Sequence, residues 1–244
     1  MISFEITGGV VTRPQRVLLY GMHGVGKTTF AAQFPSPVFI DTEDGSGHLD
    51  VRRLPHPTSW TELLQMVSYC GQALHGGTLV VDSVDWAERL CTKHVCDVKG
   101  WDNIEAPGFG KGYVAVKDEF SRMLNGLDYV MDSAKVNVVL VAHETVSRVD
   151  VPGDSMSYTT FGLKLSKHIA PLVKEWCDAI LYCHYKTMVA TDDSGRKTKA
   201  IGGTERVMQC THTAVIDAKN RWGIEGEQPM DYAVIADHIP DTTK

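Results

Sequence analysis

A glycine-rich run of eight residues, placed directly after an apolar segment, constrains the fold of this chain most. Residues 21–28 read GMHGVGKT, and residues 16–20 before them read RVLLY. The run matches the pattern G-x-x-x-x-G-K-[ST], whose glycines let backbone N–H groups curve around an anion at the start of a helix. The apolar run predicts a buried strand and the residues after Lys27 predict a helix. The sequence therefore predicts a phosphate-binding loop at the edge of an α/β sheet.

This loop predicts binding of ATP together with Mg²⁺. Lys27 is expected to contact the β- and γ-phosphates, and the hydroxyl of Thr28 is expected to bind the metal. The residues predicted to contact the nucleotide and its metal are Gly21, His23, Gly24, Val25, Gly26, Lys27, Thr28, Thr29 and Asp82.

Asp82 is the predicted second magnesium ligand. It ends the apolar run TLVV, and a carboxylate at the tip of a buried strand beside the phosphate loop is where such a ligand belongs. Asp85 is a weaker rival, because it lies one helical turn further along. The alternative role for Asp82 is that of a helix N-cap.

Acidic and imidazole side chains follow two other predicted strands. Asp41, Glu43 and Asp44 lie at the end of residues 38–42, and any of them could orient or deprotonate the attacking water. Strand alternation places Asp41 and Glu43 on the same face, and the position at the tip favours Glu43. His143 follows the apolar residues 136–142. It is either a sensor of the γ-phosphate or a satisfied polar end-group, and the sequence leaves both readings open.

Apolar runs alternate with helical patterns along the chain, which predicts an α/β fold with a doubly wound, mainly parallel sheet and antiparallel strands at its C-terminal end. We expect one domain over residues 1–244. A capping pair, Ser59 and Glu62, predicts one helix start. The other expected strands are at 16–20, 38–42, 78–81, 136–142 and 179–185, followed by two further strands that are separated by a turn at 192–195 and a polar stretch to about 205, the last of them leading into 217–219. The other expected elements are helices at 27–34, 85–98 and 116–131, loops at 100–112 and 145–162, and a short helix at 232–236.

Bulk properties narrow the class of protein. The formal net charge of −6 argues against a general nucleic-acid coating protein but allows local basic loops. No apolar run approaches the ~20 residues needed to span a bilayer, and the first ten residues lack the features of a secretory signal. We therefore expect a cytoplasmic protein without a membrane partner. Cys91, His94 and Cys96 do not have standard zinc-site spacing, so helix packing is the expected role.

Four segments in this order resemble the RecA-type core ATPases: GMHGVGKT, FIDTE followed by HLD, LVVDS, and AKNRWG. The resemblance covers residues 17–223 and implies a homo-oligomer, ring or filament, that hydrolyses ATP between subunits. In that family the basic residues of the last segment reach the γ-phosphate of the neighbouring subunit. The resemblance therefore implies that Lys219 and Arg221 act in trans, although Trp222 departs from the usual phenylalanine.

The small size of the chain is similar to that of minimal bacteriophage RecA-core proteins that anneal single strands. This resemblance implies a DNA recombination role, in the cytoplasm of a bacterial host. It also implies single-stranded DNA binding through residues 100–112 and 145–164. Aromatic and basic side chains that suit this role are Lys99, Trp101, Phe109, Lys111, Arg148, Tyr158, Phe161 and Lys164. Nearby acidic residues weaken the positive field.

Two other functions remain open. The chain could be an assembly or sensor ATPase that acts on a protein partner without nucleic acid, for which the acidic net charge is the best support. A small-molecule kinase is the third possibility, but no segment supplies an arginine-rich lid.

Overall fold

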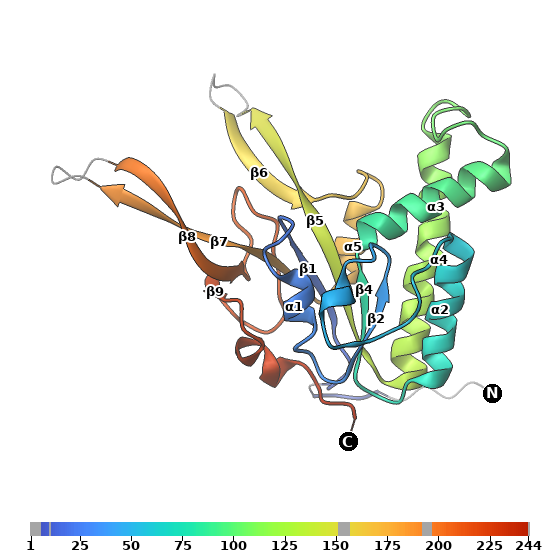
Figure 1. The fold of residues 1–244 in the computed structure, drawn as a ribbon, viewed down its shortest axis with the longest axis horizontal. Helices are drawn as coiled ribbons and strands as arrows, with labels where there is room; N and C mark the ends of the chain where they lie inside the picture. The colour runs from blue at the N-terminus through green and yellow to red at the C-terminus, as the bar shows by residue number, and fades with distance from the viewer. Residues whose placement is uncertain (1–5, 10, 151–156, 192–196, 244) are drawn as a thin grey trace.

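The computed structural model describes residues 6–9, 11–150, 157–191 and 197–243. In this part of the chain the strands form one sheet with the order β3-β2-β4-β5-β1-β7-β8-β9, and β6 pairs with β5 (Figure 1). The strands from β3 to β7 in this order are parallel, whereas β6, β8 and β9 are antiparallel to their partners. The predicted fold class is therefore confirmed. The strands are β1 Arg16–Gly21, β2 Pro37–Asp41, β3 Arg52–Arg53, β4 Thr78–Asp82, β5 Asn137–Asp150, β6 Ser157–Leu163, β7 Ala179–Thr191, β8 Lys197–Gln209 and β9 Glu227–Pro229.

Helices cover both faces of the sheet (Figure 1). One face carries α2 Trp60–Ala73, α3 Val84–Lys99, α4 Lys111–Ala134 and α5 Ala170–Trp176. The other carries α1 Lys27–Ala31 with the C-terminal 3-10 helices η2 Tyr232–Val234 and η3 Ala236–His238. Side chains of β1 alternate between the two cores, since Leu18 and Tyr20 are buried in the first and Val17 and Leu19 in the second. Among the described residues, no helix is both long and apolar enough to cross a membrane.

The strand register brings the predicted site residues to one edge of the sheet. Gly21 at the end of β1 is opposite His143 of β5, and Asp41 at the end of β2 is opposite Asp82 of β4. Carboxyl ends of parallel strands are where ligands bind in open α/β sheets. The fold thus collects residues from four strands around the start of α1.

Helix α2 begins as the capping pair predicts, with one difference. The hydroxyl of Ser59 accepts a hydrogen bond from Glu62 N at 3.2 Å. The carboxylate of Glu62 accepts from Thr58 N at 2.8 Å rather than from Ser59 N. The apolar positions Leu63, Val67 and Cys70 then face the core. Helix α1, by contrast, ends at Ala31, three residues earlier than predicted.

The prediction of a loop at residues 145–162 was wrong. Strand β5 continues to Asp150 and pairs antiparallel with β6, with Glu144 opposite Leu163 and Asp150 opposite Ser157. The loop was predicted because turn-forming residues are frequent in this segment. Residues 151–156 lie outside the described residues. The flanking segment contains several β-branched residues, Thr145, Val146 and Val149, which fit a β-strand. The hairpin projects beyond the sheet (Figure 1).

The C-terminal third also differs from the prediction. Residues 197–205, predicted as a polar stretch, belong to β8, which pairs with β7 in a second long hairpin; the predicted turn at 192–195 lies outside the described residues. No strand leads into residues 217–219, where single bridges at Ile216 and Lys219 hold the chain. Strand β9 was missed, and the predicted helix at 232–236 is two short 3-10 helices. The loop predicted at 100–112 ends earlier, because α4 begins at Lys111.

Candidate nucleotide-binding site

A polar cavity of about 360 Å³ opens at the carboxyl edge of the sheet. Its walls come from the 21–28 loop, the start of α1, the ends of β2, β4 and β5, the segment after β2, and β8. The lining residues are His23, Gly24, Gly26, Lys27, Thr28, Thr29, Asp41, Glu43, Gly45, His48, Asp82, His143 and Arg206.

The glycines of the loop are required by its path. Gly26 has a φ of 101°, and a Cβ on Gly21 would lie 2.0 Å from the carbonyl oxygen of Cys183. Lys27 is buried, and its ammonium donates to the carbonyl oxygens of Gly21 and Met22 at 3.0 and 2.8 Å. Burial lowers the pKa of Lys27. The ammonium is therefore held at the mouth of the loop, where an anionic ligand would offset its desolvation.

Thr28 and Asp82 form one oxygen-rich group. The Thr28 hydroxyl donates to Asp82 Oδ2 at 2.6 Å, and Thr42 N donates to the Asp82 carbonyl at 2.7 Å. Burial raises the pKa of Asp82 to about 6, because it outweighs the hydrogen bond from Thr28. A buried carboxylate beside a hydroxyl is a donor set that fits Mg²⁺, which prefers oxygen ligands. Thr28 and Asp82 are the residues that would hold it.

The three acidic residues at the end of β2 and just after it take different positions. The Asp41 carboxylate accepts from Glu43 N, Gly45 N and Ser46 N at 3.1, 3.2 and 2.7 Å. Burial opposes its ionisation, but these hydrogen bonds lower the pKa of Asp41 below its ordinary value. Glu43 lines the cavity, whereas Asp44 is exposed and does not. The arrangement gives Asp41 a turn-holding role and leaves Glu43 facing the cavity.

His143 connects Glu43 with Asp85. Its Nδ1 lies 3.0 Å from Asp85 Oδ2 and its Nε2 lies 3.7 Å from Glu43 Oε2. The Asp85 carboxylate also accepts from His143 N at 3.2 Å. Burial opposes ionisation of Asp85, and the contacts with His143 nevertheless lower its pKa. Asp85, the weaker magnesium candidate, is thus occupied by His143 and is absent from the cavity lining.

Residues 219–223 do not line this cavity in the same chain. Lys219 pairs through its backbone with Ile180, and Arg221 Nη1 lies 3.5 Å from Asp178 Oδ1, next to the start of β7. Strand β7 starts beside the start of β1, whereas the cavity lies at the end of β1. The 219–223 turn is therefore at the edge of the sheet opposite the cavity. The Asn220 side chain shapes the turn by donating to two carbonyls, those of Cys210 and Ile224, and by accepting from Trp222 N and Ile224 N.

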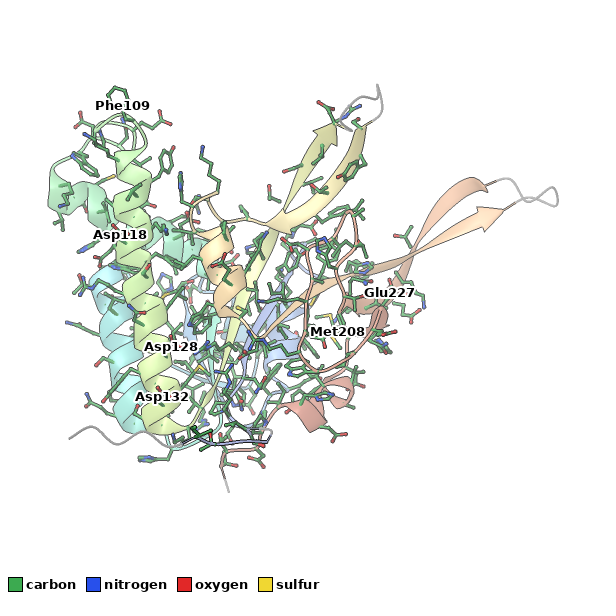
Figure 2. All side chains as sticks on the ribbon, turned by 180° about the vertical axis from the view of Figure 1, so that it is seen from behind. Phe109, Asp118, Asp128, Asp132, Met208 and Glu227 are labelled. Carbon is green, nitrogen blue, oxygen red and sulfur yellow. The ribbon has the colours of Figure 1, made fainter. Side chains whose placement is uncertain are left out.

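The segments predicted to bind DNA expose only part of their candidate side chains. Phe109 is fully exposed at the tip between α3 and α4 (Figure 2), and Lys99 and Lys111 flank it. Trp101, however, packs against the core.

In the β5–β6 hairpin, Arg148 and Tyr158 are exposed, but the Phe161 ring packs 5.6 Å from that of Tyr182. Lys164 lines a separate cavity with Arg89 and Lys93. Of the predicted set, Trp101 and Phe161 are therefore used in packing.

Four further residues belong to the site and were not predicted for it. Gly45 and His48, from the segment after β2, line the cavity. Arg206 of β8 lines the cavity, and Tyr185 of β7 donates its hydroxyl to the Gly24 carbonyl at 3.4 Å. The register of the β7–β8 hairpin places them opposite each other. The sequence predicts a strand beyond about residue 205, but residues 205–209 read ERVMQ, which gives no local sign that Arg206 reaches the cavity. Cys91, from the cluster tested for zinc, is buried and its thiol donates to Val116 O at 3.6 Å.

One comparison with known proteins supports a phosphate-loop domain. A protein-family model described as an AAA domain matches residues 13–222, most of the chain. No curated protein matches the sequence. Among solved structures, the crystal structure of the RadB recombinase is similar with a TM-score of 0.47 and 15% identity, covering 88% of this chain and 85% of that chain.

Proposed function

This chain belongs to the AAA domain family of phosphate-loop proteins, and on that premise we propose that it hydrolyses ATP to control binding of single-stranded DNA. The DNA role includes annealing or pairing of strands in phage recombination. The active form would be a homo-oligomer that holds ATP between neighbouring subunits. The AAA domain membership supports nucleotide binding, and the remaining parts of the proposal rest on the residues discussed below.

The observation that carries the ATPase proposal is the convergence of three kinds of group on one cavity. Lys27 supplies a cation for the phosphates, Thr28 and Asp82 supply oxygens for a metal, and Glu43 supplies a carboxylate. Bound magnesium would neutralise charge on the phosphates. Glu43 would orient the attacking water or take its proton, and the loop amides would hold the phosphate tail in line.

The proposed link between nucleotide and DNA is strand β5. It runs without interruption from the core through His143 into the projecting hairpin, and Lys164 N at the end of β6 donates to His143 O at 2.9 Å. Both strands of the hairpin therefore leave the sheet at His143. A change in the contacts of His143 on loss of the γ-phosphate would tilt the hairpin as a unit.

The DNA contacts would come from the β5–β6 hairpin and from the tip between α3 and α4. Tyr158 and Phe109 can stack on bases, while Arg148, Lys99 and Lys111 can contact phosphates. Base stacking and unspecific phosphate contacts suit binding without sequence preference. This supports single strands over duplexes, whose bases are already stacked.

The oligomer is proposed because Lys219 and Arg221 lie at the edge opposite the cavity of their own chain. A neighbouring subunit could present its cavity to this edge. ATP would then bridge Lys27 of one subunit and the 219–223 turn of the next, as in a heterologous interface that closes a ring or extends a filament.

ATP hydrolysis measured with and without DNA tests the proposal. We expect MgATP turnover that single-stranded DNA stimulates, while duplex DNA of equal length has little effect. Fluorescence anisotropy should show tighter binding of a labelled single strand with a non-hydrolysable ATP analogue than with ADP. Turnover that no DNA changes, with no binding of single strands, would contradict the DNA role and leave an ATPase that acts on a protein partner.

A further inference from the structure

We infer that Arg206 binds the phosphate tail of the nucleotide in the cavity of its own chain, as a second cation beside Lys27. The inference deepens the proposed nucleotide binding and rests on it. Lys27 begins α1, whereas Arg206 lies on β8, so the two cations reach the cavity from distant parts of the chain.

The position of the guanidinium is the first observation. A Cβ atom built on Gly26 would lie 2.8 Å from Arg206 Nη1 and 3.5 Å from its Cζ. The guanidinium therefore lies on the side of Gly26 where other residues carry a side chain. In a loop of this pattern the glycine faces and amides leave room for a phosphate. A phosphate held there would lie within hydrogen-bonding reach of Arg206.

The second observation is that Arg206 is free to act. Within the described ranges its guanidinium has no ion pair or hydrogen bond, although the side chain lines a cavity that also contains Glu43 and Asp82. The neighbouring Glu205 is paired with Lys186 at 3.6 Å. Arg206 thus presents unused donors to a cavity that an anionic ligand would enter.

The third observation is that the backbone of Arg206 is held in place. Arg206 O accepts from Met230 N at 3.1 Å, and the next residue, Val207, is buried. Tyr185, its partner across the hairpin, donates to the Gly24 carbonyl of the phosphate loop. The backbone is already ordered, so on ligand binding only the side chain loses conformational entropy.

The chemistry favours a phosphate contact over a purely structural role. A guanidinium can donate two parallel hydrogen bonds to one phosphate, which an ammonium such as that of Lys27 cannot. An arginine that binds phosphates already in the ground state should strengthen binding of ADP as well as ATP. That distinguishes Arg206 from Lys219 and Arg221, which are proposed to act from a neighbouring subunit.

Calorimetry with MgADP and with a non-hydrolysable MgATP analogue tests the inference. We expect Arg206→Ala to raise the Kd for both ligands at least about 10-fold, since the lost hydrogen bonds involve charged groups. Arg206→Lys should recover part of the affinity. The matched control is Lys186→Ala, which removes a cation from the same hairpin outside the cavity lining and should leave the Kd unchanged.

Equal affinities of the wild type and Arg206→Ala, with matching melting temperatures, would overturn the inference alone. A wild-type protein that binds neither ligand would instead overturn the proposed function, and this inference with it. An equal loss in Lys186→Ala would assign the effect to the overall charge of the hairpin and would also overturn the inference.

A mixing experiment tests whether Arg206 acts in its own chain. Chains with Lys27→Ala and chains with Arg206→Ala are combined and titrated with MgADP. Each cavity then lacks one of the two cations, so we expect no sites of wild-type affinity. Sites of wild-type affinity would place Arg206 in the neighbour's cavity and overturn the inference.

Discussion

The cavity at the carboxyl edge and the 219–223 turn at the opposite edge both present basic side chains, but in different surroundings. Lys27 is buried and held by two carbonyl oxygens, within reach of the Thr28–Asp82 pair. The Arg221 side chain is 65% exposed, and Asn220 fixes the backbone around it. The first region is assembled to receive a ligand within one chain. The second is a basic turn that does not line the nucleotide cavity of its own chain.

Removal of Lys27 should have the largest effect on the cavity. Lys27→Ala leaves the loop amides in place but deletes the cation at its mouth, so ATP hydrolysis should fall at least about 10³-fold. A phosphate-release assay at saturating MgATP measures this. Lys117→Ala, an exposed lysine on α4, is the control for loss of one positive charge. Turnover near the wild-type level in Lys27→Ala would show that the 21–28 loop is not the catalytic site.

The opposite edge should respond in a way that depends on assembly. In Lys219→Ala/Arg221→Ala we expect hydrolysis to fall about 10³-fold, the scale of arginine fingers, while the Kd for nucleotide changes little. Mixing this variant with Lys27→Ala should restore activity, because roughly a quarter of the interfaces in a random mixture combine an intact cavity with an intact turn. Absence of recovery in oligomers confirmed by light scattering would count against catalysis across subunits.

The three carboxylates at the end of β2 and just after it should respond differently to substitution. Glu43→Gln should lower kcat about 10²-fold with nucleotide affinity retained, as expected for loss of a general base. Asp41→Asn should lower the free energy of unfolding by about 1–3 kcal/mol, because the turn loses a charged acceptor of three amide hydrogen bonds. Asp44→Asn, at an exposed position, serves as the control and should change neither quantity. Unchanged kcat in Glu43→Gln would remove Glu43 from the mechanism.

The sequence predicted the parallel part of the molecule well, and the reason is local. Strands β1, β2 and β4 are continuous apolar runs buried on both faces, and each ends in a residue whose chemistry marks the edge, such as Gly21 or Asp82. The hairpins were harder to predict. Residues 145–149 are exposed, and residues 197–205 read KTKAIGGTE, so the composition of neither segment requires a strand. Antiparallel pairing makes both of them strands.

The same difference explains which site residues were found. Lys27, Thr28 and Asp82 belong to motifs whose residues are adjacent in sequence. Arg206 enters the cavity only through the register of two long strands, which the sequence alone does not specify. The pairing of Asp85 with His143 likewise depends on how α3 packs against β5, and it turns a weak metal candidate into a partner for the imidazole.

The smallest expected effect concerns the coupling between the cavity and the β5–β6 hairpin. Asp85 does not line the cavity, but it accepts from both the backbone and the ring of His143, and so it positions the imidazole at the base of the hairpin. Asp85→Ala should lower basal hydrolysis only slightly, yet reduce its stimulation by single-stranded DNA about 5-fold, a usual size for coupling between sites. Asp85→Asn should recover much of the stimulation, because its amide oxygen can still accept from His143 Nδ1. Asp118→Ala, an acidic residue on the outer side of α4 (Figure 2), is the control for the change in charge. If stimulation in Asp85→Ala equals that of the wild type, the contact of Asp85 with His143 does not couple the cavity to the β5–β6 hairpin.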